Sequence, residues 1–382
     1  MDDFSQLTTP AFLVERPVLE RNCDRMREKA RASSVIFRPH VKTHKVAEIG
    51  RMQHGGAAGP ITASTLAEVE HFAVAGFRDI TYAVPIAPEK LERAAGIAQR
   101  IERLNVLIDS LEALAAIESS GVTFDAFLKI DCGYHRAGVN PDDPESVELV
   151  RRMMRSKSLR FHGLLTHAGH SYHATNPAEI RAIAEQETGA VTRFRDVILS
   201  EAKDLVGRDP SPSARLGMTS PDVIRSVGST PTASVVDRFT DCDEVRPGNY
   251  VFYDAFQATI GSCRIEDVAV SVLTTVIGSY PERRTLIVDA GALALSKDLG
   301  PDHVDPRFGY GIVCDPALRR LPMKLIALSQ EHGKISSPEP LPVGSQLRIV
   351  PNHSCLTAAM YDRYHAVEGG RVVGEWRPAR GW

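Results

Sequence analysis

The strongest constraint on the fold is an alternation of strand-like and helix-like segments between residues 34 and 250. Short apolar or β-branched runs recur there, separated by helix formers such as Thr65–Ala75 and Leu111–Ile117. Such alternation is typical of βα units with a parallel sheet, and eight units in about 220 residues predict a TIM-type (β/α)8 barrel. A doubly wound sheet is the alternative. The expected strands are Ser34–Arg38, Ile61–Ser64, Ile80–Val84, Leu104–Asp109, Phe124–Asp131, Leu159–His167, Val223–Val227 and Glu244–Tyr250.

The pattern changes after residue 250, where strand-like segments recur without long helices. This change predicts a second, C-terminal β-rich domain. Proline and serine neither continue a helix nor pair in a sheet, so Gly207–Arg215 and Ser336–Pro342 are expected to be loops. The expected strands of the β-rich domain are Ser271–Ile277, Arg284–Asp289, Leu347–Val350 and Arg371–Glu375.

Composition narrows the class of function. The 382 residues include 45 Lys and Arg against 48 Asp and Glu, and the resulting net charge of -3 makes nucleic acid an unexpected partner. The acidic N-terminus lacks the regions of a signal peptide, and no apolar run approaches the length of a membrane span. The six cysteines are scattered without a C-x-x-C pair, so a cytoplasmic protein is expected.

Lys42 is the first candidate for chemistry. It lies in Arg38–Lys45, which follows the first predicted strand at the barrel face where (β/α)8 enzymes place their active sites. Burial near His40 and His44 would favour the neutral amine that forms a Schiff base. The alternative, which composition alone favours, is a basic loop of solvated side chains.

Two further segments follow predicted strands at the same face. Arg136, between the glycines of Lys129–Gly138, suits an anion or a phenolate oxygen, although a turn with a surface arginine explains the segment equally well. The segments Ser226–Thr232 and Arg246–Tyr250 carry the small residues that a phosphate site after strands seven and eight requires. The alternative for both is a plain turn.

Histidines and a cysteine complete the candidate set. Thr166–His173 places three histidines, among them His167, beside Tyr172, and general acid–base groups would come from such a cluster. His353 and Cys355 are two residues apart, on one side of an extended chain, which suits a metal. The alternative there is a buried cysteine beside a surface histidine.

Eight segments together resemble the D-threonine aldolase and D-serine dehydratase family of fold-type III pyridoxal-phosphate enzymes, which are relatives of alanine racemase. The resemblance spans nearly the whole chain. It implies an alanine racemase-like barrel over residues 15–250 and a D-serine dehydratase-like β domain over residues 251–382 that takes in a strand from residues 1–14. The segments are Thr9–Val14, Arg38–Lys45, Ile130–Gly138, Ser226–Thr232, Arg246–Gly248, Asp289–Gly291, Glu331–Gly333 and Pro351–Cys355.

The resemblance also implies a site. Lys42 would carry pyridoxal 5'-phosphate as a Schiff base, with Arg136 against the phenolic oxygen and Tyr172 near the cofactor. His353 and Cys355 would match the metal ligands of the family, and two subunits would complete each other's sites as a homodimer. Glu201–Asp222 departs from the pattern and is expected to be an insertion. The phosphate would be bound by Gly228, Ser229, Thr230 and the chain near Tyr250.

The activity that this resemblance implies is that of a lyase acting on a D-amino acid with a 3-hydroxyl group. Cysteine as the second metal ligand favours a dehydratase, which gives a 2-oxo acid and ammonia, and its thiolate favours zinc. Retro-aldol cleavage to glycine and an aldehyde is the alternative. An amino-acid racemase and a non-catalytic carrier of pyridoxal phosphate are further alternatives.

Overall fold

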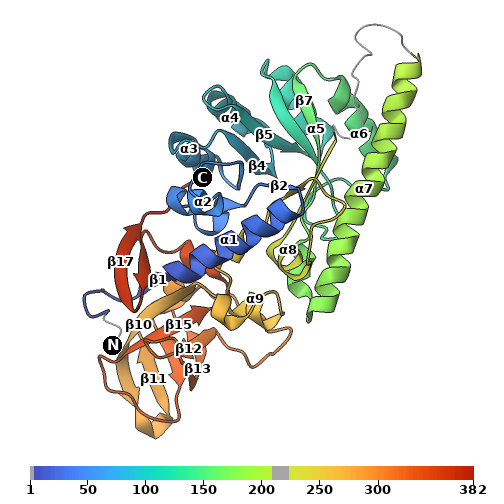
Figure 1. Cartoon of the computed structure of the whole chain (residues 1–382). Coiled ribbons are helices and arrows are strands. Elements are labelled where there is room, and N and C mark those ends of the chain that lie inside the picture. The colour runs from blue at the N-terminus through green and yellow to red at the C-terminus, as the bar shows by residue number, and fades with distance from the viewer. Residues whose placement is uncertain (1–3, 209–222) are drawn as a thin grey trace.

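The computed structural model describes residues 4–208 and 223–382, which form a barrel and a β-rich domain (Figure 1). The barrel sheet has the order β2-β9-β8-β7-β6-β5-β4-β3, and all neighbouring strands are parallel. A bridge between His40 and Thr62 joins the two edges, so the predicted TIM-type barrel is confirmed. The strands are β2 (Ile36–Phe37), β3 (Ile61–Ala63), β4 (Asp79–Pro85), β5 (Arg103–Ile108), β6 (Phe124–Lys129), β7 (Leu159–Leu165), β8 (Ile224–Val227) and β9 (Glu244–Val245).

Helices cover the outside of this sheet (Figure 1). In α6, for example, the Asp143 side chain accepts the Glu145 N–H, Pro144 starts the first turn, and Leu149 and Met153 bury one face. The predicted helices appear as α3 and α5. The helices are α1 (Arg16–Ala32), α2 (Ala47–Gln53), α3 (Leu66–Val74), α4 (Leu91–Ala98), α5 (Leu111–Ser119), α6 (Pro144–Arg155), α7 (Pro177–Arg208) and α8 (Thr230–Val235).

Three sequence predictions differ from the structure or fall partly outside it. The strand expected over Glu244–Tyr250 ends at Val245, because Pro247 has no N–H to donate and Asn249–Val251 form a 3-10 turn, η6. A Cβ at Gly248 would lie 2.9 Å from the His40 Cβ, so this turn fits against the first βα loop only with glycine. The expected loop at 207–215 and the expected insertion at 201–222 begin in the last turns of α7, and their remaining residues from 209 onward lie outside the described residues.

The β-rich domain is built on a sheet of order β11-β14-β13-β12-β15-β10-β1-β16-β17. Because β10 pairs with both β15 and β11, six of its strands curl into a closed ring. The N-terminal strand β1 lies in this sheet, antiparallel to β10 and parallel to β16. The strands are β1 (Ala11–Glu15), β10 (Val270–Tyr280), β11 (Thr285–Val288), β12 (Gly311–Cys314), β13 (Arg320–Leu328), β14 (Gly333–Ser336), β15 (Gln346–Pro351), β16 (Tyr364–Glu368) and β17 (Arg371–Trp376).

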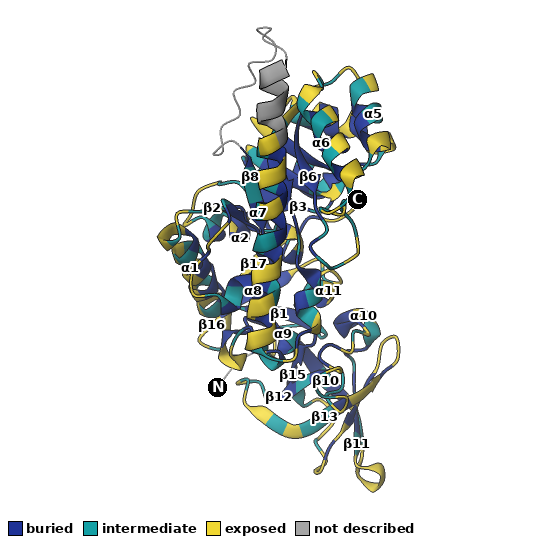
Figure 2. Cartoon of the chain, turned by 90° about the vertical axis from the view of Figure 1, so that its right-hand side faces the viewer, coloured by how far each residue is buried: buried dark blue, intermediate teal, exposed yellow. Residues whose placement is uncertain are grey.

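Short helices connect the two parts, and buried residues run from one part into the other (Figure 2). These helices are α9 (Ala255–Thr259), α10 (Ala292–Leu295) and α11 (Ser354–Ala358). The C-terminal tail returns to the barrel, where the Ala379 N–H donates to the Lys45 carbonyl over 2.7 Å. None of the helices in residues 4–208 and 223–382 combines the length and the apolar character that a bilayer crossing requires.

A buried chain of charges closes the barrel between its first and last strands. Arg38 Nε donates to Glu244 Oε2 over 2.6 Å, and its Nη1 donates to Asp79 Oδ1 over 2.6 Å. The second oxygen of Glu244 accepts the Ser226 hydroxyl over 2.5 Å, and Ser226 Oγ in turn accepts Arg246 Nη1 over 2.6 Å. Because Arg38, Glu244 and Arg246 are all buried, the two guanidinium charges depend on the Glu244 carboxylate, together with Asp79 at Arg38, for compensation.

The first prediction concerns this chain of charges. Glu244→Leu should destabilise the folded protein by about 3–5 kcal/mol, because it leaves the Arg38 and Arg246 guanidinium groups buried beside an apolar side chain. The measurement is guanidinium unfolding followed by far-UV circular dichroism.

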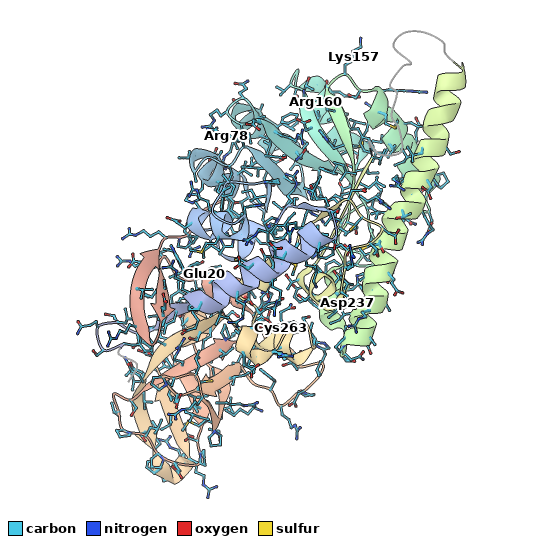
Figure 3. The ribbon with its side chains drawn as sticks, in the orientation of Figure 1. Glu20, Arg78, Lys157, Arg160, Asp237 and Cys263 are labelled. Atoms are coloured by element: carbon cyan, nitrogen blue, oxygen red, sulfur yellow. The ribbon has the colours of Figure 1, made fainter. Side chains whose placement is uncertain are left out.

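Glu20 on α1 is the matched control (Figure 3). Its carboxylate pairs with Arg16 over 2.8 Å, but both side chains are 44% exposed. Glu20→Leu should therefore change the stability by about 0.5 kcal/mol or less. Equal losses from the two substitutions would contradict the role of the buried network.

Candidate functional site

Lys42 lies in the short 3-10 turn η1 (Val41–Thr43), directly after β2. The His40 Nδ1 accepts the Lys42 backbone N–H over 3.3 Å and so starts this turn. The Lys42 side chain is exposed at the barrel mouth, and its positive charge lowers the pKa values of His40, His167 and Cys355. These three groups come from the first βα loop, the loop after β7 and the β-rich domain, so Lys42 stands where the three meet.

His167 follows β7, and its Nδ1 lies 3.1 Å from the Gly228 carbonyl oxygen. A carbonyl only accepts, so the proton of the neutral ring sits on Nδ1 and Nε2 is left as an acceptor. Burial, reinforced by the charges of Lys42 and Lys129, holds the pKa of His167 well below its ordinary value. The ring is therefore a neutral base of defined tautomer at physiological pH.

Positive charge is concentrated around this mouth. Burial and the neighbouring Arg246 lower the pKa of Lys129 to about 8, and burial lowers the pKa of Arg246 to about 10. Arg136 is exposed and lies over the Tyr134 ring, 4.9 Å from its centroid. Its charge contributes to the low pKa values of both Lys129 and His167. Such a cluster attracts an anionic ligand.

The residues predicted to bind phosphate, Gly228, Ser229, Thr230 and the chain at Tyr250, lie together, and we call this group the cradle. For Tyr250 the backbone, not the side chain, belongs to it. Thr230 Oγ1 accepts the N–H groups of Gly248 over 3.3 Å and of Tyr250 over 3.2 Å, so its own hydrogen is directed elsewhere. Ser229 caps α8 and forms a capping box with Thr232. The phenol of Tyr250 is buried and accepts a hydrogen bond from Gln53, so only its backbone faces the cradle.

Tyr172, in the 3-10 turn η3 (Gly169–His173), lies between the cradle and the β-rich domain. Its ring packs edge-on against Phe256, with centroids 5.8 Å apart, and its hydroxyl interacts with Thr230. Burial, together with the nearby Cys355 and Asp254, raises its pKa well above the ordinary value. Tyr172 is therefore a protonated donor at the centre of the site.

His353 and Cys355 are brought together, but not on an extended chain as the sequence predicted. His353 is the N-cap of α11 and Cys355 lies within that helix. His353 Nδ1 lies 3.0 Å from Asp298 Oδ2, and Cys355 Sγ lies 3.2 Å from Thr43 Oγ1 in the lysine turn. Burial opposes ionisation of Cys355, but the hydrogen bond and charge of His353 and the charge of Lys42 lower its pKa to about 7.

Three residues that position this pair were not singled out from the sequence. The Asp254 carboxylate accepts the Ser354 N–H over 3.0 Å and the Asn249 amide over 2.9 Å. Asn249 also donates to Ser354 Oγ over 2.8 Å, so the end of the barrel is tied to the start of α11. Asn249 lies in a predicted segment, but Asp254 and Ser354 carry no signal that distinguishes them from ordinary loop residues.

The remaining histidines of the cluster do not converge on the site. The His170 ring stacks on Tyr134 with centroids 6.2 Å apart. His173 is exposed and lies beside His303. Of the three clustered histidines, His167 is therefore the one next to Lys42.

Metal-ligating side chains are sparse. Within residues 4–208 and 223–382 no group of three or more His, Cys, Asp and Glu side chains is arranged to hold a metal ion. A metal at His353 and Cys355 would thus take two ligands from this chain. All six cysteines are free thiols, so Cys355 is not committed to a disulfide.

Comparison with known proteins gives two family matches. Residues 14–255 match the alanine racemase N-terminal domain, and residues 269–367 match the putative serine dehydratase domain. The D-threo-3-hydroxyaspartate dehydratase of Delftia sp. (strain HT23) is 37% identical over 100% of both chains. Its solved structure has a TM-score of 0.90 and covers 100% of both chains. A cysteine-to-alanine mutant of a D-threo-3-hydroxyaspartate dehydratase, solved in a metal-free form, is 36% identical with a TM-score of 0.89 and the same coverage.

Other relatives include both kinds of lyase. The D-serine dehydratase of Dictyostelium discoideum is 36% identical over 100% of this chain and 99% of its own. The D-threonine aldolase of Filomicrobium marinum is 25% identical, with a TM-score of 0.80 over 98% of this chain and 96% of its own. The chain therefore belongs to the D-serine dehydratase and D-threonine aldolase family of fold-type III pyridoxal-phosphate enzymes, which are lyases.

Proposed function

We propose that this enzyme eliminates water from a D-3-hydroxy amino acid, such as D-serine or D-3-hydroxyaspartate, to give a 2-oxo acid and ammonia. The observation that carries the proposal is the 3.2 Å contact between Thr43, which follows Lys42, and Cys355, which lies two residues after His353. Elimination breaks one bond at Cα and one at Cβ, so it needs a cofactor site and a hydroxyl-activating site side by side. The two dehydratases are also more similar to this chain than the aldolase is.

The residues present fit pyridoxal 5'-phosphate. Lys42 would attach it, Arg136 would face its phenolic oxygen, and the cradle at Ser229 and Thr230 would take its phosphate. The positive charge around His167 suits this anionic ligand, and the Gly228 φ of +126° shapes the cradle. When bound, the cofactor withdraws electrons from the substrate α-carbon and weakens the bonds there.

The pair His353 and Cys355 fits a divalent metal. Asp298 holds the Nδ1 of His353, which leaves Nε2 for the metal, and a thiol with a pKa of about 7 is readily deprotonated at neutral pH. When bound, the metal acts as a Lewis acid on the substrate 3-hydroxyl, and two protein ligands leave coordination positions for that oxygen. The thiolate favours zinc over magnesium or manganese.

The side chains of the chain itself handle the protons. Lys42 Nζ, at the barrel mouth, is placed to move the proton at the substrate Cα. Tyr172, whose pKa is raised by burial and by Cys355, remains protonated and would be a hydrogen-bond donor near Thr230. His167 stays neutral and offers Nε2 as an acceptor.

Retro-aldol cleavage is the second candidate function, because the acceptor Nε2 of His167 also suits removal of the 3-hydroxyl proton. A racemase requires a base on each side of the α-carbon and no metal, and a carrier requires neither a base nor a metal. Either of these functions would leave the adjacent Asp298, His353 and Cys355 without a role.

We also propose that the enzyme is a cytoplasmic homodimer. The six free thiols are consistent with a reducing compartment. In fold-type III enzymes the β-rich domain of one subunit helps to close the site of another, and the exposed mouth at Lys42 and Arg136 fits such a completion.

The second prediction concerns the lysine. Borohydride reduction should fix pyridoxal phosphate covalently to Lys42, and Lys42→Ala should abolish both the label and turnover, because the substitution removes the attachment atom. The label is located by peptide mass spectrometry.

Lys45→Ala is the control, because Lys45 is bound instead to Glu68, with Nζ 3.1 Å from Oε1. This variant should retain the label. A label on Lys45 or Lys129 in the wild-type protein would show that the cofactor is placed wrongly.

The third prediction tests the reaction itself. D-serine and D-threo-3-hydroxyaspartate should each yield a 2-oxo acid and ammonia in equal amounts, with glycine as a trace product. The products are quantified by keto-acid derivatisation and amino-acid analysis. Glycine with an aldehyde as the sole products would refute the dehydratase and establish the aldolase.

The fourth prediction concerns the metal. Chelation, or Cys355→Ala, should reduce turnover by about 100-fold or more and leave the absorption spectrum of the bound cofactor intact, because different segments hold the two groups. Added zinc should restore the chelated wild-type enzyme. Cys263, beside α9, provides the control, since Cys263→Ala should retain activity (Figure 3). Full activity in metal-free protein would contradict the proposed metal-binding role of His353 and Cys355.

A further inference from the structure

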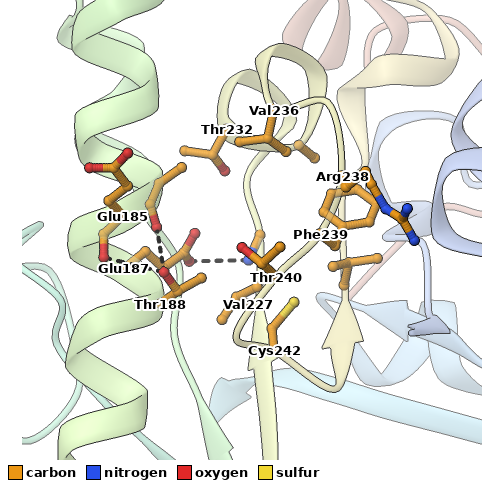
Figure 4. Close-up of a pocket in the computed structure, with 14 residues that line it drawn as sticks. Glu185, Glu187, Thr188, Val227, Thr232, Val236, Arg238, Phe239, Thr240 and Cys242 are labelled. Atoms are coloured by element: carbon orange, nitrogen blue, oxygen red, sulfur yellow. Dashed lines mark hydrogen bonds between the residues drawn. The ribbon is translucent and has the colours of Figure 1, made fainter. Parts of the chain in front are cut away.

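A buried glutamate that takes no direct part in the proposed reaction holds two loops of the site. Glu187 lies on α7, and its side chain is 1% exposed. Its Oε1 accepts the backbone N–H of Gly228 over 3.1 Å (Figure 4). The same oxygen accepts the backbone N–H of Ala168 over 3.0 Å. A single carboxylate oxygen therefore joins the loop after β7 to the loop after β8.

Both N–H groups belong to neighbours of site residues. Ala168 directly follows His167, and Gly228 directly precedes Ser229 of the phosphate cradle. The carbonyl of the same Gly228 lies 3.1 Å from His167 Nδ1. Gly228 is thus held on its N–H side by Glu187 and on its carbonyl side by the imidazole.

The conformation of Gly228 makes this arrangement specific. Its φ of +126° is one that other residues rarely adopt, and a Cβ there would lie 3.0 Å from the Arg246 backbone nitrogen. Little freedom remains for the glycine to turn its N–H elsewhere. Because this N–H is used by Glu187, Gly228 contributes to the cradle by its shape and not as a donor to the phosphate.

The surroundings of Glu187 allow the carboxylate to be replaced without crowding. A cavity of about 70 Å³ lies beside it, lined by residues that include Val227, Thr232, Phe239 and Cys242 (Figure 4). Burial raises the pKa of Glu187. The two backbone hydrogen bonds and the charges of Arg246 and Lys129 act in the opposite direction and reduce this rise.

We infer that Glu187 is a positioning residue that fixes His167 against the phosphate cradle. By accepting both N–H groups, Glu187 keeps the Gly228 carbonyl aimed at His167 Nδ1. The hydrogen bond from Nδ1–H to this carbonyl then fixes the tautomer of His167 and leaves Nε2 directed at the reacting groups. The inference rests on the function proposed for His167, but its test is made on the resting enzyme without turnover. A wrong assignment of the reaction would leave the result of that test unchanged.

Two substitutions of matched size separate this role from a merely structural one. Glu187→Met removes the acceptor, whereas Glu187→Gln retains a carbonyl oxygen in its place. Pyridoxal phosphate dissociation is measured by fluorescence, and the His167 tautomer is measured by nitrogen NMR of histidine-labelled enzyme. Glu187→Met should raise the dissociation constant by about tenfold or more and shift the His167 signals away from the Nδ1–H tautomer. Glu187→Gln should stay within about threefold of wild type, with unchanged His167 signals.

The control is Glu185→Met, because Glu185 is exposed on the same helix and lines the same cavity. It should match the wild type in both measurements. Wild-type affinity in Glu187→Met would overturn the inference. Weakened affinity with unchanged His167 signals would overturn it too, because Glu187 would then support the cradle alone.

A second variant covers the case in which Glu187→Met fails to fold. Glu187→Asp withdraws the carboxylate by one methylene, so hydrogen–deuterium exchange should accelerate in both segment 166–172 and segment 226–232. Unchanged protection in either segment would show that Glu187 does not hold the two loops together.

Discussion

The buried charges between the first and last barrel strands are the constraint on which the rest of the structure depends. Arg38 and Glu244 lie on or directly beside β2 and β9, the first and last barrel strands of the chain, which pair in parallel. A buried ion pair contributes little net stability by itself, but loss of one partner leaves the charge of the other buried and uncompensated. Arg246 extends the chain to the Thr166 carbonyl, directly before His167. Closure of the barrel and placement of the site are therefore parts of one hydrogen-bonded network.

Much of the barrel was predictable, because β-branched runs and helix-spaced apolar residues each follow a simple period. The fold class and the eight strands were predicted, whereas strand ends depended on local chemistry, as Pro247 and Gly248 show at β9. Four strands of the β-rich domain, β12, β13, β14 and β16, were missed. Strand β13 illustrates the reason, since Arg320, Pro322 and Lys324 interrupt its apolar residues and Pro322 is unusual within a strand.

The site divides in the same way. Lys42, His167 and Thr230 were predictable because barrel strands bring their carboxyl ends to one face. Glu187 and Asp254 were not predictable. From its sequence context, a glutamate in a polar helix is expected to be solvent-exposed, and only the tertiary fold buries it. The contact of Asn249 with Ser354 was equally out of reach, because it joins residues 105 positions apart. The candidate site residues thus lie in recognisable sequence segments, whereas the side chains that contact and orient them are brought there only by the packing of the fold.

The electrostatics of the candidate site favour different protonation states for three groups. Burial and positive neighbours keep His167 neutral, burial keeps Tyr172 protonated, and His353 with Lys42 favours the thiolate of Cys355. Environments that push pKa values apart in this way suit the proposed roles of a base, an acid and a metal ligand. These protonation states depend on the interface between the barrel and the β-rich domain, where Thr43, next to Lys42, contacts Cys355 and the charge of Lys42 lowers the pKa of Cys355. The bonds of Asp254 to Asn249 and Ser354 maintain that contact, so the same interface sets both the geometry and the protonation of the site.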